Sequence, residues 1–220
     1  MINPVLHVKP ISALAARLSV ISSLFFVIIL GSLHFLEPEF DPTWRFISEY
    51  ALGNFGWLMH LAFGLLAVSL ISAGIVTLSQ ARNITGYIGL VILGLSAIGI
   101  IVAAIFATDP ISVSPDDATF SGKIHSIGAT LDYTPVAALL ISFALARNEA
   151  WKVIQVRLFV TAGITIIIMA LFILQIPHDG QFGPDVLVGL FGRILIVSYL
   201  GWILIVGTHA LKLRRQNHKV

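Results

Sequence analysis

The stretch GYIGLVILGLSAIGIIVAAIFA, residues 86–107, contains no charged residue. About 20 consecutive apolar residues allow an α-helix to cross the hydrocarbon core of a bilayer, so this stretch predicts a membrane-spanning helix. Five other stretches meet the same criterion, and all are too long for the strands of a membrane barrel. The predicted spans cover residues 18–36, 56–78, 86–107, 124–146, 158–176 and 187–211. We therefore predict an all-α, polytopic membrane protein: a six-transmembrane-helix bundle that forms a single membrane domain over residues 1–220.

The composition of the whole chain agrees with a membrane protein. Hydrophobic residues make up 57% of the 220 residues and charged residues 11%, and the mean hydropathy is +0.96. So few charged residues cannot cover a soluble globule, and disordered chains are richer in charge. The absence of cysteine excludes disulfides, thiolate metal ligands and cysteine nucleophiles.

The basic residues predict the orientation of the bundle. Of the 13 lysine and arginine residues, all but Arg45, Lys123 and Arg193 lie on the side of the predicted bundle that holds both chain termini. Short cytoplasmic segments of membrane proteins carry an excess of lysine and arginine. We therefore predict that both termini are cytoplasmic. The basic C-terminal tail is then a topology signal, and we expect no binding of nucleic acid.

Ionisable side chains are costly inside a bilayer and mark functional sites by default. In this chain they concentrate in the predicted outer half, together with polar residues of the first outer loop. We predict an outward-facing pocket formed by Ser48, Glu49, Asp109, Asp132 and Arg193. Asp132 and Arg193 are expected at similar depths, which favours an ion pair that either binds a ligand or holds two spans in register.

Three histidines of the same half, His34, His60 and His125, are candidate metal ligands. Three neutral imidazoles and a water would give the open tetrahedral site of a catalytic zinc. The fifth predicted span, 158–176, is almost uniformly apolar. We expect it to lie mainly against lipid or a partner, and we expect glycines such as Gly89 to allow close helix packing or oligomerisation.

Several short motifs occur in a characteristic order along the chain. They are Ser48-Glu49-Tyr50-Ala51-Leu52-Gly53 with Gly56-Trp57, Thr108-Asp109-Pro110, Gly122-Lys123-Ile124-His125 and Gly192-Arg193. In this order they resemble the prokaryotic six-span membrane family catalogued as domain-of-unknown-function family 998, over roughly residues 15 to 212. The resemblance implies a six-helix protein of the inner (cytoplasmic) membrane, and it implies no activity.

The residues favour three kinds of function, and they leave open whether the chain is an enzyme. The first is binding, sensing or transport of a small molecule, an ion or a lipid at the polar pocket. The second is a membrane-embedded metal-dependent hydrolase acting on a lipid-like substrate, with zinc or a similar divalent metal held by the three histidines. The third is a b-type haem protein, in which His60 and His125 would be the axial ligands. A scaffold role with a structural polar pocket is a further alternative.

Overall fold

A computed structural model describes residues 11–114, 116–177 and 180–217 of the chain. Within these ranges the regular elements are all helices, and six helical segments are long and apolar enough to span a membrane, as the sequence predicts. The elements are α1 (Ala13–Leu36), η1 (Ile47–Leu52), α2 (Gly56–Leu78), α3 (Ile84–Ile105), α4 (Phe120–Thr130), α5 (Thr134–Leu145), α6 (Glu149–Lys152), α7 (Gln155–Leu174) and α8 (Val188–Asn217).

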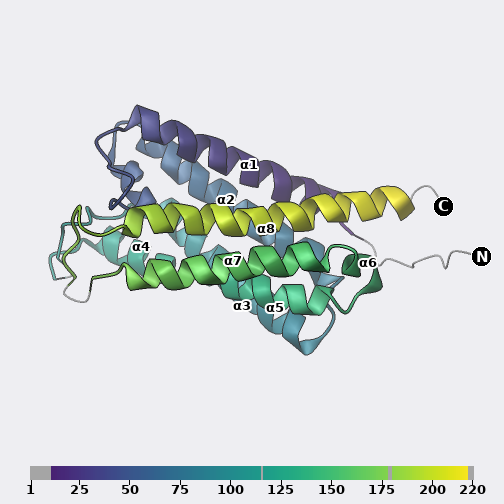
Figure 1. Cartoon of the computed structure of the whole chain (residues 1–220). Helices are drawn as coiled ribbons and strands as arrows, with labels where there is room; N and C mark the ends of the chain where they lie inside the picture. The colour runs from purple at the N-terminus through teal and green to yellow at the C-terminus, as the bar shows by residue number, and fades with distance from the viewer. Residues whose placement is uncertain (1–10, 115, 178–179, 218–220) are drawn as a thin grey trace, which may run out of the picture.

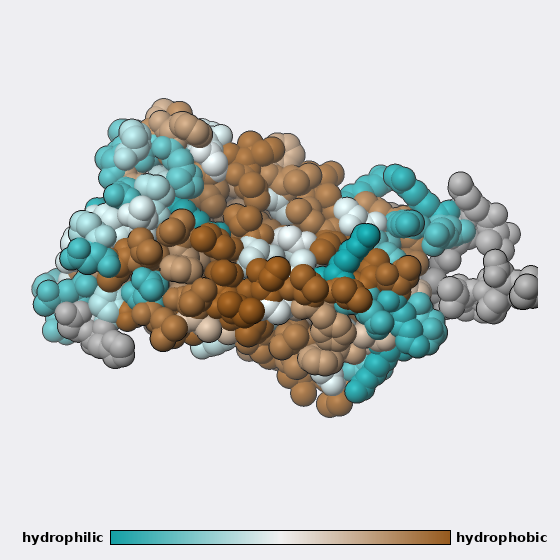
Figure 2. All heavy atoms as spheres, viewed as in Figure 1, coloured by the Kyte–Doolittle hydropathy of each residue, from teal (hydrophilic) through white to brown (hydrophobic). Residues whose placement is uncertain are grey.

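The long helices run side by side along one axis, with the first and last described residues at the same end of the bundle (Figure 1). We call the opposite end the outer end and the end near the termini the inner end. On the face drawn in Figure 2, hydrophobic residues form a band along the middle, and hydrophilic residues gather at both ends. This distribution suits a bundle whose middle lies in hydrocarbon. The cytoplasmic location of the termini stays a prediction from the lysine and arginine distribution.

The helices pack in a closed ring. α1 packs on α2, α2 on α3, α3 on α5, α5 on α7, α7 on α8, and α8 returns to α1. Near the inner end, α1 and α8 approach closely, because a Cβ atom on Gly207 would lie only 2.5 Å from Ser19 Oγ. Toward the outer end the two helices diverge (Figure 1).

The fifth span is the most exposed of the six. Only Leu158, Ala162 and Thr165 are buried along α7, and 17% of its most apolar window is buried, compared with 39–56% in the other spans. The prediction that this span turns most of its surface away from the bundle is confirmed.

The fourth span differs from the continuous helix predicted over 124–146. It is split into α4 and α5, with Leu131, Asp132 and Tyr133 outside both helices. The 11 residues of α4, at about 1.5 Å each, place this break about 16 Å from the outer start of the span. The break therefore lies near the middle of the membrane, where irregular backbone occurs only inside protein or beside a polar cavity.

Candidate functional site

Arg193 lies at the centre of the polar contacts near the outer end. The residue is only 7% exposed. Its Nε donates to His34 Nε2 (3.0 Å), Nη1 donates to the carbonyls of Arg45 (2.7 Å) and Gly189 (3.0 Å), and Nη2 donates to the Tyr50 hydroxyl (3.2 Å). These bonds tie α8 to α1, to η1 and to the loop before η1. All four acceptors are neutral, and Arg193 forms no ion pair with a carboxylate of the described residues.

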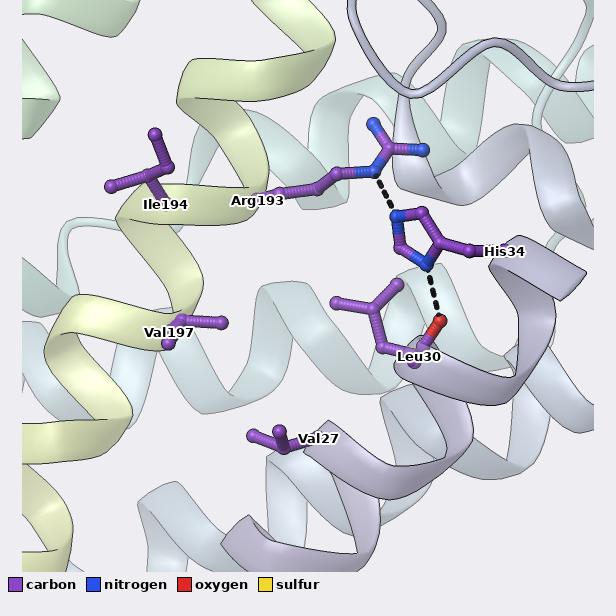
Figure 3. A pocket seen from close by; sticks show the side chains of 7 residues that line it. Val27, Leu30, His34, Arg193, Ile194 and Val197 are labelled. Atoms are coloured by element: carbon purple, nitrogen blue, oxygen red, sulfur yellow. Dashed lines mark hydrogen bonds between the residues drawn. The ribbon is translucent and has the colours of Figure 1, made fainter.

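His34 uses both of its ring nitrogens in this arrangement. Nδ1 lies 2.7 Å from the Leu30 carbonyl and Nε2 accepts from Arg193, and Figure 3 shows both bonds. One nitrogen donating and the other accepting is the pattern of a neutral imidazole with the proton on Nδ1. The lone pair that would ligate a metal is therefore occupied by a hydrogen bond.

A groove of about 300 Å³ lies on the inner side of the Arg193–His34 contact, between the diverging outer halves of α1 and α8. Its walls are apolar and come from both helices, and Arg193 and His34 lie at its outer end (Figure 3). The wall residues are Val27, Leu30, Gly31, Ile194 and Val197. Val27 is 37% exposed and Val197 45% exposed. The groove therefore opens on the outside of the bundle.

Gly31 lines the groove and has no side chain to narrow it. A Cβ atom at this position would meet no other atom within 4 Å, so a larger side chain would enter the groove rather than collide with the backbone.

Glu49 connects two outer loops. It is completely buried, pairs with the Arg45 guanidinium (2.9 Å), and accepts hydrogen bonds from the amides of Phe46 (3.0 Å) and Ile111 (2.8 Å). Ser48 is buried beside it on η1. The structure thus places Ser48 and Glu49 next to Tyr50 and so close to Arg193, but the carboxylate of Glu49 is already bound within the chain.

Asp109 accepts hydrogen bonds from Thr119, the N-cap residue of α4. Its carboxylate accepts from the amide and the hydroxyl of Thr119, both at 2.8 Å, and packs on Gly122, where a side chain would overlap it. A carboxylate is favourable at a helix N-terminus. Asp109 therefore fixes the entry of the fourth span, and the structure does not bring it to Arg193 by any direct bond.

His60 and His125 bind the outer end of α3. Their Nδ1 atoms lie 2.8 Å from the carbonyls of Ala104 and Phe106, respectively. The last carbonyls of a helix lack partners within that helix, so the two histidines supply donors from α2 and α4. The described residues contain no group of three His, Asp or Glu side chains placed to hold a metal ion. The structure therefore does not gather His34, His60 and His125 into the metal centre considered from the sequence.

Asp132 does not form the expected ion pair with Arg193. Its Oδ1 accepts from the amide (3.1 Å) and hydroxyl (2.6 Å) of Thr134, and Oδ2 accepts from the Tyr199 hydroxyl (3.0 Å). Tyr199 follows Arg193 by six residues on α8, which corresponds to about 9 Å along the axis. The sequence predicts Asp132 and Arg193 at similar depths. In the structure, Asp132 lies farther from the outer end than Arg193 does.

The break in the fourth span is hydrogen-bonded from a neighbouring helix. Ser96 Oγ of α3 accepts from the Tyr133 amide (2.9 Å) and donates to the Leu131 carbonyl (3.3 Å). With the bonds of Asp132, these contacts satisfy backbone groups that the interruption would otherwise leave without partners. Asp132 therefore first of all holds the turn that precedes α5, by accepting from Thr134 just past the N-cap residue Tyr133.

Two polar features escape the sequence-based prediction. At the inner end, which the hydropathy pattern suggests is nearly apolar, Trp151 Nε1 donates to Gln80 Oε1 (3.2 Å), and His209 Nε2 lies 2.9 Å from the Ala150 carbonyl. At the outer end, Glu37 is completely buried at the end of α1. Glu37 is followed by Pro38, a pair typical of a turn between spans, and nothing in the sequence indicates its burial.

The turn at Asp41 gives a pH prediction. The Thr43 hydroxyl, and secondly its amide, hold the pKa of Asp41 below its ordinary value, and the Thr43 carbonyl accepts from the Leu190 amide near the start of α8 (2.9 Å). A carboxyl whose folded pKa is lowered stabilises the fold above its unfolded pKa, and this contribution is lost as the pH falls through the folded pKa. We expect Asp41→Asn to lose stability at neutral pH and to approach the wild type on acidification.

The measurement is thermal unfolding of the detergent-purified protein from neutral pH to about pH 3. Asp116→Asn, which removes an exposed loop carboxyl, is the control. A constant difference between Asp41→Asn and the wild type across this range would contradict the prediction.

Comparison with known proteins gives one family. No curated protein and no solved structure matches the chain. The model of a family described as "Protein of unknown function (DUF998)" matches residues 20–209. Because the match covers most of the chain, including α8 with Arg193, this membrane protein belongs to the DUF998 family.

Proposed function

We propose that this protein binds an amphiphile, with the acidic headgroup at Arg193 and a hydrocarbon chain in the groove between α1 and α8. The observation that carries the proposal is the guanidinium of Arg193, which is buried among neutral acceptors at the outer end of an apolar groove. The apolar groove suits the hydrocarbon chain of such a ligand, and the cation suits its acidic headgroup.

The charge of Arg193 favours an acidic group. Burying a cation costs free energy unless an anion or a set of hydrogen bonds compensates it. A guanidinium has five N–H donors. The four hydrogen bonds of Arg193 use one on Nε, two on Nη1 and one on Nη2. One Nη2 hydrogen is left for a phosphate or carboxylate oxygen, and such charge-assisted bonds are about twice as strong as neutral ones.

The groove favours a hydrocarbon chain. Its walls are aliphatic apart from Arg193 and His34, and its volume of about 300 Å³ is at the lower end of the range for small-molecule sites. Because it opens on the outside of the bundle, a chain can enter from the bilayer without crossing the polar outer loops.

Gly31→Leu tests the groove directly. The leucine side chain would enter the open space beside Gly31 and compete with the ligand chain, while removing a glycine from a helix is itself favourable. We expect binding of dihexanoylphosphatidylglycerol, a short-chain lipid with an acidic phosphate, to weaken by about tenfold or more. The measurement is calorimetric titration of the detergent-purified protein.

Gly94→Leu is the matched control. Gly94 lies on the exposed face of α3, and a Cβ atom there also meets nothing within 4 Å. The Gly94→Leu variant should bind dihexanoylphosphatidylglycerol with the affinity of the wild type. Equal affinities of the wild type and Gly31→Leu would refute the groove as the binding site.

A further inference from the structure

A second buried ionisable side chain contacts the same short helix as Arg193 and has one oxygen without a donor among the described residues. Glu37, the C-cap of α1, has no exposed surface. Its Oε1 accepts from the Phe55 amide, but no group of the described residues donates to its buried Oε2. Buried carboxylate oxygens normally accept hydrogen bonds, so this atom points to a donor that the described chain does not supply.

Glu37 and Arg193 contact the same short helix. The Glu37 carboxylate packs on Gly53, the residue that ends η1, where a side chain would overlap it. Tyr50, three residues earlier, accepts from Arg193. The Gly53 amide donates to the Tyr50 carbonyl (3.2 Å), so the two contacted residues belong to one turn at the end of η1. A cation that contacts no carboxylate and a carboxylate oxygen without a donor in the described chain are thus held by the same turn.

We propose that the headgroup bound at Arg193 is zwitterionic, with its phosphate at Arg193 and a primary ammonium that donates to Glu37 Oε2. This inference rests on the proposed function and names its ligand class: a phosphoethanolamine headgroup. A primary ammonium has three N–H donors and suits an ionised carboxylate. A quaternary ammonium has none, and a glycerol headgroup has no positive charge.

The test compares three lipids with the same dihexanoyl chains on the detergent-purified full-length protein. Phosphatidylethanolamine has the phosphate and the N–H donors, phosphatidylcholine has the phosphate and a charge without N–H donors, and phosphatidylglycerol has the phosphate alone. Free phosphoethanolamine is the fourth ligand, and it separates recognition of the headgroup from recognition of a lipid. Each is titrated against the wild type and Glu37→Gln.

We expect the wild type to bind the phosphatidylethanolamine about tenfold more tightly than the other two lipids, because one charge-assisted hydrogen bond is gained. Glu37→Gln should lose this preference and bind the three lipids with similar affinities. The lipid should also bind more tightly than free phosphoethanolamine, since the groove holds the chains.

Two results would overturn this inference without affecting the proposed function. One is a wild type that prefers phosphatidylglycerol. The other is an unchanged preference for phosphatidylethanolamine in Glu37→Gln. Either result leaves the proposed function standing as long as Gly31→Leu weakens the binding of phosphatidylglycerol. Binding of none of the lipids would refute both proposals. Thermal unfolding of Glu37→Gln shows whether the variant is folded.

Discussion

Alanine in place of Arg193 is expected to lower the free energy of unfolding by about 2–4 kcal/mol and to abolish binding of the amphiphile. The substitution removes the donors to His34 of α1, to Tyr50 of η1, and to two backbone carbonyls, one in the loop before η1 and one in α8. Buried acceptors without donors are costly, and part of this cost is offset because a buried charge is removed. Denaturant unfolding in detergent, followed by tryptophan fluorescence, measures the effect.

Arg193→Lys separates the charge from the geometry. A lysine keeps the cation but cannot reproduce the planar fork of donors. We expect an intermediate stability and an affinity for dihexanoylphosphatidylglycerol about tenfold below that of the wild type. Arg17→Ala, at an exposed position near the inner end, should behave as the wild type in both assays. Wild-type stability of Arg193→Ala would show that the contacts of Arg193 do not hold the outer end together.

Asp132→Ala is expected to destabilise the protein by about 2–4 kcal/mol. The substitution removes the bonds that the Asp132 carboxylate accepts from Thr134 in the turn before α5, a loss of about 1 kcal/mol. It also leaves the buried Tyr199 hydroxyl without its acceptor, which adds about 1–3 kcal/mol. The position in the middle of the membrane makes replacement of these bonds by water difficult. Thermal unfolding in detergent provides the measurement.

Asp132→Asn shows which property of the aspartate matters. Asparagine keeps an oxygen that can accept from Thr134, and its amide can still bond the Tyr199 hydroxyl. We expect a loss of about 1 kcal/mol or less, with Tyr199→Phe between the two Asp132 variants. If Asn is as harmful as Ala, the break depends on the charge of Asp132 and not on its hydrogen bonds, contrary to the structural role assigned here.

The helical architecture follows from the sequence because span length and hydropathy are local properties. The break in the fourth span also has a local signal, since Asp132 followed by Thr134-Pro135 is typical of a helix start. The apolar run that follows, residues 135–141, continues the hydropathy of the span past that signal. The break further depends on Ser96, whose two hydrogen bonds reach across from α3, and no local pattern predicts such a contact.

The candidate site is only partly predictable. Arg193 stands out in the sequence as a basic residue in the outer half of a span, but its partner His34 is 159 residues away and looked like a metal ligand. The groove depends on the close approach of α1 and α8 at Gly207 and on their divergence beyond it. Glu37 is buried because Gly53 leaves room for its carboxylate, a contact between two loops that spacing does not reveal.

Photocrosslinking of a lipid with a diazirine in its acyl chain tests the central claim most directly. The detergent-purified protein is irradiated with such a phosphatidylglycerol, and the labelled peptides are identified by mass spectrometry. The proposal predicts labels concentrated on residues 27–34 and 193–197, with strong reduction in Gly31→Leu but not in Gly94→Leu. Labels spread evenly over the exposed helices, with α7 marked as strongly as the groove, would contradict it.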